Sequence, residues 1–193
     1  MKLQVVLTRV LVTALVLGAP SIARAKIERA VRRPDVLKTL KVGQWLRIEG
    51  EVRNDRTVSC TEIKLLAGDF QDDDWEMFGQ VEVVDRRNGE FRIAMVTIRP
   101  SENADFESPD GSIKALADLR PGMLVEVGGT YTKDGFLATD VDDESGGRRA
   151  FPRQRRIGIT ARIERVDVAR RGITAMGMVF VVTENTQIKS VIR

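Results

Sequence analysis

The stretch TENTQI, residues 183–188, has a near-copy in SENADF, residues 101–106. The two copies differ in the length of chain that comes after them. About forty residues of patterned sequence come after the copy at 101–106, whereas only KSVIR remains after Ile188. The later copy therefore lacks its continuation at this end of the chain, and the rest of that repeat must lie elsewhere in the sequence.

Two further alignments place the continuation near the N-terminus. At an offset of 82 residues, GQVEVVD (79–85) aligns with ARIERVD (161–167). At an offset of 79 residues, LRPGMLVEVGGTY (119–131) aligns with LKVGQWLRIEGEV (40–52). The segment before the complete repeat therefore corresponds to a back half, and the segment after it corresponds to a front half.

We accordingly divide the chain into a back half-repeat at 36–66, a complete repeat at 75–144 and a front half-repeat at 155–193. Each half offers two or three strands, which are too few to cover one hydrophobic face. We expect the two halves to fold together into one split unit, with the complete repeat inserted between them. The alternative is that each half completes itself against a partner chain.

The complete repeat gives the element order β-β-β-α-β-β, which is that of a five-stranded OB-type barrel. Asn88-Gly89 predicts a hairpin turn, and residues 91–98 alternate as in a strand buried on both faces. Residues 112–119 are a candidate for a short helix. We therefore expect an all-β protein with two small OB-like five-stranded barrels and short helices. An open β-meander with a covering helix fits the same order.

Residues 1–25 have the features of a secretory signal. Basic residues flank a short apolar run, and Ala23-Arg24-Ala25 supplies the small residues of a cleavage site. The sequence thus predicts a periplasmic or secreted protein, with a retained membrane anchor as the alternative. Loss of this segment removes three of the 31 basic residues and none of the 28 acidic ones, which leaves no formal net charge. The basic pI is therefore no argument for nucleic acid, and we expect no specific nucleic-acid partner.

The residue types that are absent from the sequence limit the catalytic and metal-binding functions it can have. The sequence contains no histidine, which excludes the commonest general base and the usual zinc ligand. Its one cysteine, Cys60, is expected in the core, with an intermolecular disulfide or a reactive thiol as the alternative. The acidic stretch 69–76 lacks the spacing of an EF-hand loop and is interpreted as a solvated turn. The sequence predicts no cofactor and no metal site.

The glycine and aliphatic patterns of the repeats resemble a known family. DLRPGMLVEVGGTY and DGFLATDV in the back half, with GQVEVVD in the front half, are similar to an uncharacterised bacterial family of exported repeat proteins. Its members carry a domain of unknown function thought to be OB-like, and the resemblance covers 36–66, 75–144 and 157–190. It implies an exported β-rich module without an established activity, so no catalytic residues are carried over. The split arrangement departs from the whole repeats of the family.

Two groups of residues are candidates for binding a ligand or partner. Residues 145–154 form a basic flexible linker between the repeats, and the arginines in and beside it are Arg148, Arg149, Arg153, Arg155 and Arg156. A solvated linker is the simpler interpretation, and binding of an anionic partner is the functional one. Trp45 and Arg47 alternate with apolar residues in one predicted strand, so they are expected on an outer sheet face where an aromatic ring can stack a ligand. The alternative is that the neighbouring unit covers Trp45.

These features favour a non-catalytic binding or assembly module of the bacterial cell envelope that acts through barrel surfaces. Its partner is expected to be an envelope protein complex or an anionic envelope component, and the membrane only if the N-terminal segment is retained. The alternative function is a carboxylate-based hydrolase acting on an envelope glycan, because paired carboxylates provide acid–base chemistry without histidine.

Overall fold

Short stretches of alternating apolar and polar residues dominate the chain, and most of them form strands. The computed structural model describes residues 33–67, 75–145 and 155–192, with side chains described from Val36 to Lys189 within these ranges. The described residues belong to one compact unit. Within these ranges no helix has the length and apolar character needed to cross a membrane.

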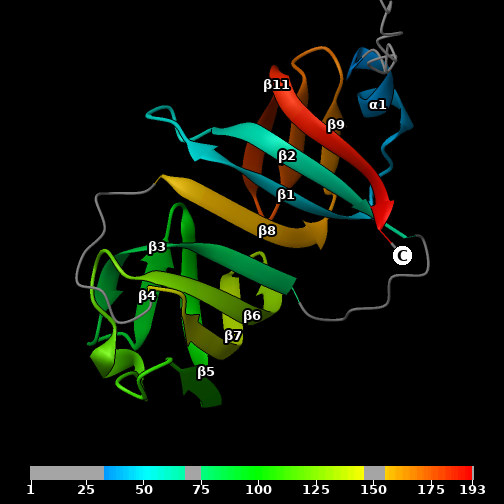
Figure 1. Cartoon of the computed structure of the whole chain (residues 1–193). Coiled ribbons are helices and arrows are strands. Elements are labelled where there is room, and N and C mark those ends of the chain that lie inside the picture. Colours follow the sequence, from blue (N-terminus) through cyan, green and yellow to red (C-terminus); the bar gives the residue numbers. More distant parts are fainter. Residues whose placement is uncertain (1–32, 68–74, 146–154, 193) are drawn as a thin grey trace, which may run out of the picture. The chain divides into compact units, whose positions relative to one another are not determined.

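The described elements run along the chain in an almost unbroken series of strands (Figure 1). In chain order they are α1 (Arg33–Thr39), β1 (Trp45–Val52), β2 (Val58–Leu66), β3 (Trp75–Asp85), β4 (Glu90–Ile93), β5 (Val96–Glu107), η1 (Leu116–Asp118), β6 (Leu124–Thr132), β7 (Gly135–Asp143), β8 (Arg156–Arg162), β9 (Arg165–Asp167), β10 (Gly172–Ala175) and β11 (Met178–Ile192).

The complete repeat forms a closed barrel of five strands. The strands pair in the order β3-β4-β5-β7-β6, and β6 pairs again with β3, so the ring closes. The predicted Asn88-Gly89 turn joins β3 to β4, with Gly89 at φ +70°. The all-β class and a five-stranded barrel are therefore confirmed.

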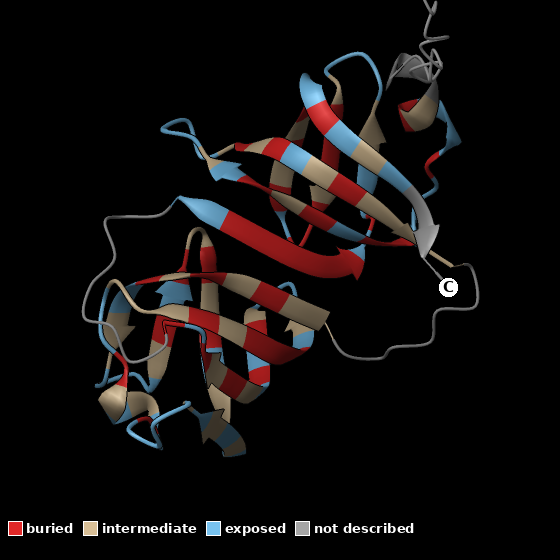
Figure 2. Ribbon diagram, viewed as in Figure 1, coloured by how far each residue is buried: buried red, intermediate tan, exposed pale blue. Residues whose placement is uncertain are grey.

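The barrel is filled by alternate residues of its strands, as the buried bands in Figure 2 show. Its fully buried side chains include Met77, Val81, Phe91, Ile93, Ile98, Val125, Val127, Phe136, Ala138 and Val141. A register shift at Gly129 bends β6 against β7. Gly129 has φ +150°, and a Cβ there would collide with the Leu137 carbonyl, so this tight bend requires glycine.

The other six strands repeat this order with one interruption. They pair as β8-β1-β2-β11-β10-β9, so β1 and β2 pair with strands from the C-terminal part of the chain. The strand that corresponds to β3 is divided between β8 and β9. At this break the Ile163 amide donates to the Gln44 carbonyl (2.9 Å), and the Gly43 amide donates to the Ile163 carbonyl (2.8 Å). The strand pairs of the described residues do not close this set into a ring, so a second barrel stays a prediction.

The two copies of the repeated motif, SENADF and TENTQI, form equivalent bulges. Between Pro100 and Asp105 in β5, the parallel pairing with β7 shifts register, and β11 shifts in the same way against β2 between Val182 and Gln187. The Thr183 amide donates to Thr186 Oγ1 (2.8 Å). Thr186 Oγ1 in turn donates to the Cys60 carbonyl (2.8 Å). The hydroxyl of Thr186 therefore ties the bulge in β11 to β2.

Two local predictions were wrong. Residues 91–98 are not one strand, because the chain turns at Ala94 (φ +49°) and divides into β4 and β5. The helix expected at 112–119 is a single turn, η1. There the Asp118 carboxylate accepts from the amides of Lys114 and Ala115 (3.0 and 3.1 Å), which favours one capped turn over a longer helix.

The core prediction for Cys60 is confirmed, because the residue is 2 % exposed. The signal segment at 1–25 and nearly all of the linker at 145–154 lie outside the described residues. The division of the chain into an inserted unit and a split unit stays a prediction.

Candidate functional site

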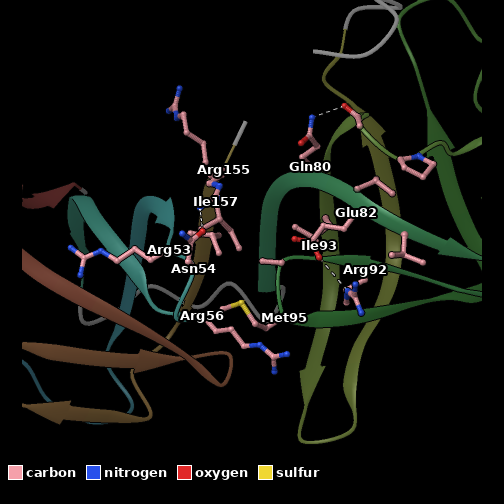
Figure 3. Close-up of a pocket in the computed structure, with 17 residues that line it drawn as sticks. Arg53, Asn54, Arg56, Gln80, Glu82, Arg92, Ile93, Met95, Arg155 and Ile157 are labelled. Carbon is pink, nitrogen blue, oxygen red and sulfur yellow. Dashed lines mark hydrogen bonds and ion pairs between the residues drawn. The ribbon is translucent and has the colours of Figure 1, made fainter. Parts of the chain in front are cut away.

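A groove of about 840 Å³ lies between two turns that are distant in sequence. One wall comes from the end of β1 and the turn after it, and the other comes from β3, β4 and the turn after β4 (Figure 3). The start of β8 lines it as well. Figure 3 shows Arg53, Asn54 and Arg56 on one side and Glu82 and Arg92 on the other.

The turn after β1 holds its arginines in a defined geometry. The Thr57 amide and hydroxyl both donate to Asp55 Oδ1 (2.9 and 2.7 Å), and the Arg53 amide donates to the Thr57 carbonyl (2.8 Å). The hydrogen bonds from Thr57 lower the pKa of Asp55. Arg56 has φ +65°, a left-handed conformation that this local network maintains. Arg53 and Arg56 are exposed.

The opposite wall combines apolar and charged side chains. Ile93 is buried, Val83 is 44 % exposed, and Ala94 and Met95 are half-buried. Arg92 Nε donates to Glu82 Oε2 at 3.2 Å, which forms an ion pair at the edge of this wall. The groove therefore offers apolar surface with charged groups around it.

The groove carries an excess of positive charge. The described residues of its lining include five arginines and one glutamate. Arg92 pairs with that glutamate, and Arg156 pairs with Glu49 (3.1 Å). The other three arginines of the lining are Arg53, Arg56 and Arg155, and within the described parts of the chain they form no ion pair. Arg53 donates to Ser59 Oγ (3.0 Å), and Arg155 donates to Asn54 Oδ1 (2.6 Å). The charge of Arg53 also helps to lower the pKa of Asp55 in the same turn. Guanidinium groups that form no ion pair are suited to binding carboxylate or phosphate groups.

The predicted basic residues are divided by the structure. Arg155 and Arg156 line the groove, at the start of β8. Arg148, Arg149 and Arg153 lie outside the described residues. The structure thus places two of the five predicted arginines in one concave site together with arginines that the sequence analysis did not select.

The prediction that Trp45 lies on an exposed sheet face was wrong. Trp45 is 7 % exposed. Its ring centroid lies 5.2 Å from that of Trp75 in β3, and the Arg162 guanidinium lies over it at 5.0 Å. Trp75 in turn packs against Tyr131 at 5.6 Å. The alternative interpretation, that the neighbouring unit covers Trp45, is therefore the observed one, because Trp75 in β3 of the complete repeat packs on it.

Arg47, the other predicted residue of that face, joins the two repeats. It is exposed, and its guanidinium lies 3.7 Å from the Glu126 carboxylate in β6. Burial and then the charge of Glu76 raise the pKa of Glu126, whereas Arg47 lowers it. Neither Arg47 nor Glu126 lines the groove.

The arginines missed by the sequence analysis are Arg53, Arg56 and Arg92. Two of them occur in RNDRT (53–57), a polar turn between two predicted strands that holds two basic residues within four positions. That density of charge in a short turn was the available signal. For Arg92 there was none, because it alternates with apolar residues like any outer position of a strand.

Other ligand chemistries find less support. Among the described residues no group of three or more acidic, cysteine or histidine side chains is arranged to hold a metal ion. The described part of the groove's lining contains one carboxylate, that of Glu82, which is already paired with Arg92. The side chains that line the groove are therefore suited to binding an anion.

Comparison with known proteins connects these repeats to a family. A family model described as "Domain of unknown function (DUF5666)" matches residues 25–64 and 78–142. The chain belongs to this family. The two DUF5666 matches cover β1 and most of β2 in the first segment and nearly the whole closed barrel in the second, which supports the repeated units deduced from the sequence. The DUF5666 description assigns no function. No curated protein and no solved structure matches the chain.

Proposed function

We propose that the protein is a non-catalytic binding module whose groove takes an anionic partner. The observation that carries the proposal is the lining of the groove, in which five arginines accompany one glutamate. Charge-assisted hydrogen bonds from guanidinium groups to carboxylate or phosphate are about twice as strong as neutral ones. The exposed Arg53, Arg56 and Arg155 are the principal contacts in this proposal.

The proposal includes the cellular setting expected from the sequence, which is export to the periplasm or beyond the cell as part of an envelope assembly. Residues 1–25 and the resemblance of the repeats to exported proteins support it. A hydrolase acting on an envelope glycan is the less favoured function. Such an enzyme needs two convergent carboxylates, whereas Glu82 is the one acidic residue among the described residues that line the groove.

A binding titration tests the proposal. The probes are a pentaglutamate peptide, a sulfated heparin oligosaccharide, a five-nucleotide oligothymidylate and vesicles containing phosphatidylglycerol, each measured at 50 and 300 mM NaCl. We expect at least one probe to bind with an affinity that falls with salt, because exposed charges are screened. The combined Arg53→Ala, Arg56→Ala and Arg155→Ala variant should bind that probe at least tenfold more weakly, a loss of about 1.4 kcal/mol.

A matched variant distinguishes the loss of binding caused by changes in the groove from the loss caused by a lower net charge. Arg87, Arg165 and Arg170 are exposed and do not line the groove, so their combined replacement by alanine removes the same charge elsewhere. This control should bind like the wild type. Equal weakening by both variants, or no binding of any probe by the wild type, contradicts the proposed function.

A further inference from the structure

The two repeats are related by a local two-fold axis that passes through the pairing of β3 with β8. Met77 pairs with Ile159, and these residues are equivalent in the alignment at an offset of 82. The neighbouring pairs exchange under the same operation: Glu76 pairs with Thr160, and Phe78 pairs with Gly158. Because this antiparallel pair is centred on equivalent residues, a two-fold rotation exchanges the two repeats. Each place where a turn of one repeat meets a turn of the other, here called a junction, therefore has a counterpart on the other side of the axis.

The groove is one of two such junctions. It lies where the turn after β1 meets the turn at Ala94 and Met95. At the equivalent junction, Tyr131 near the end of β6 lies close to the turn at Met176 and Gly177. A Cβ added to Gly177 would lie 2.8 Å from the Tyr131 hydroxyl, so this second junction is closely packed.

The two junctions differ because of the size of the side chains at equivalent positions. Aromatic residues fill the second junction, where Trp75 lies between Trp45 and Tyr131. In the groove smaller residues replace them, with Ile157 at the position of Trp75 and Val52 at that of Tyr131. At the position of Gly177 the groove has the larger Met95. The groove thus corresponds to the space that aromatic side chains occupy at the related site, except where Met95 stands.

The packed junction also shows which polar groups accompany the aromatic rings. Arg162 lies over Trp45 at 5.0 Å. Both carboxylate oxygens of Glu164 accept from the Gly177 amide at 3.2 Å. Burial and then the charge of Glu164 raise the pKa of Tyr131, which places this carboxylate beside the rings. Glu82 is the residue of the groove equivalent to Glu164, so a carboxylate is present at both junctions and the aromatic rings are what the groove lacks among its described residues.

We propose that the groove binds an acidic peptide segment of a partner protein, whose aromatic side chain enters the space next to Val52 and Ile157. The inference rests on the proposed function and specifies its ligand. Carboxylates of the segment bind Arg53, Arg56 and Arg155, and its ring packs on the apolar wall. None of the described residues that line the groove is aromatic, so these residues offer no platform on which single-stranded nucleic acid stacks its bases.

Three matched peptides separate the charge from the ring. They are Asp-Asp-Trp-Asp-Asp, the same peptide with alanine in place of tryptophan, and Asn-Asn-Trp-Asn-Asn, each carrying a fluorescein and titrated by fluorescence anisotropy. We expect the tryptophan peptide with four aspartates to bind at least tenfold more tightly than either of the other two, because burial of the ring and pairing of the carboxylates each contribute.

Variants that fill the groove with larger side chains provide the second part of the experiment. Val52→Tyr, Ile157→Trp and Met95→Gly together copy the side chains at these positions of the packed junction and keep all five arginines. Met95→Gly is included because a Cβ at the equivalent Gly177 would lie 2.8 Å from the Tyr131 hydroxyl. These replacements should abolish the tenfold preference for tryptophan over alanine. Because Ile157 is 2 % exposed and its replacement can prevent folding, Met95→Trp at the half-buried rim is tested in parallel, with melting curves of each variant. Met95→Trp should reduce the same preference at least threefold.

The outcomes distinguish the two proposals. If the tryptophan and alanine peptides bind equally and the arginine variant weakens both, the groove binds anions and the aromatic anchor is wrong. If the filled variants fold and retain the preference for tryptophan, the ring binds elsewhere and the inference fails. Tighter binding of oligothymidylate or phosphatidylglycerol vesicles than of the tryptophan peptide also overturns it. Failure of every anionic probe refutes the proposed function itself.

Discussion

Replacing Thr186 with valine should destabilise the protein far more than its small change in shape suggests. Thr186 is fully buried in the bulge of β11. Its hydroxyl accepts from the Thr183 amide and donates to the Cys60 carbonyl, both at 2.8 Å. Valine keeps the size of the side chain and removes both bonds, so two backbone groups lose their partners.

The expected cost can be worked out from those two bonds. An unsatisfied buried backbone group costs about 1–3 kcal/mol, and the additional methyl group returns about 1 kcal/mol through its burial. Two such groups, less the gain from the methyl, give a loss of about 1–5 kcal/mol in the free energy of unfolding. In a protein of this size that loss lowers Tm by roughly 2–20 °C.

Urea denaturation monitored by circular dichroism measures the change, with the m-value checked for constancy. Thr97→Val is the matched control, since Thr97 lies at the half-buried position of β5 equivalent to Val179 in β11. Among the described residues, Thr97 has no side-chain hydrogen bond to lose. We expect the control to change stability by less than about 0.5 kcal/mol, in the range usual for surface substitutions. A Thr186→Val loss as small as the control would refute the role of the hydroxyl.

Three further predictions concern the core and the charged surface. Trp45→Ala should cost about 3–5 kcal/mol, because the buried ring packs on Trp75; a loss below about 1 kcal/mol in urea titrations would contradict this. Burial raises the pKa of the Cys60 thiol to about 12, so iodoacetamide at pH 8 should modify Cys60 only in urea, and rapid labelling of the native protein would show the residue to be accessible. Burial and then neighbouring carboxylates raise the pKa of Asp142. Asp142→Asn should therefore raise stability at pH 7 by less than about 1 kcal/mol, and this gain should vanish as falling pH protonates the wild-type carboxyl; a gain that persists at pH 3 in melting curves would exclude the electrostatic cause.

The repeat made much of the fold predictable. Glycine and aliphatic spacing located β1, β2, β6 and β7, because a strand with one buried face leaves a period of two in the sequence. The turn at Ala94 was missed because it has neither glycine nor asparagine to mark it. The pairing of the chain's two end segments was deduced from incomplete repeats, a signal that is unusual in a single sequence.

The candidate site was less predictable for a definite reason. The groove depends on the register of β3 against β8, and no local pattern encodes that register. The same register brings Trp75 onto Trp45 and so buries the residue that looked exposed in its own strand. The size differences between Trp75 and Ile157, and between Tyr131 and Val52, were present in the alignment. These size differences indicate a groove only when the two-fold axis shows that the positions are equivalent.

The pairing of β2 with β11 sets an order for folding during synthesis. The closed barrel has all of its strands once residue 143 has emerged from the ribosome. The β1–β2 hairpin must wait for residues as far along the chain as Thr186, which is 126 residues beyond its partner Cys60. At about 5–20 residues per second that wait lasts roughly 6–25 s. During this interval the apolar face of the hairpin lacks its final partner, so a chaperone that protects the nascent chain is most needed for the residues translated first.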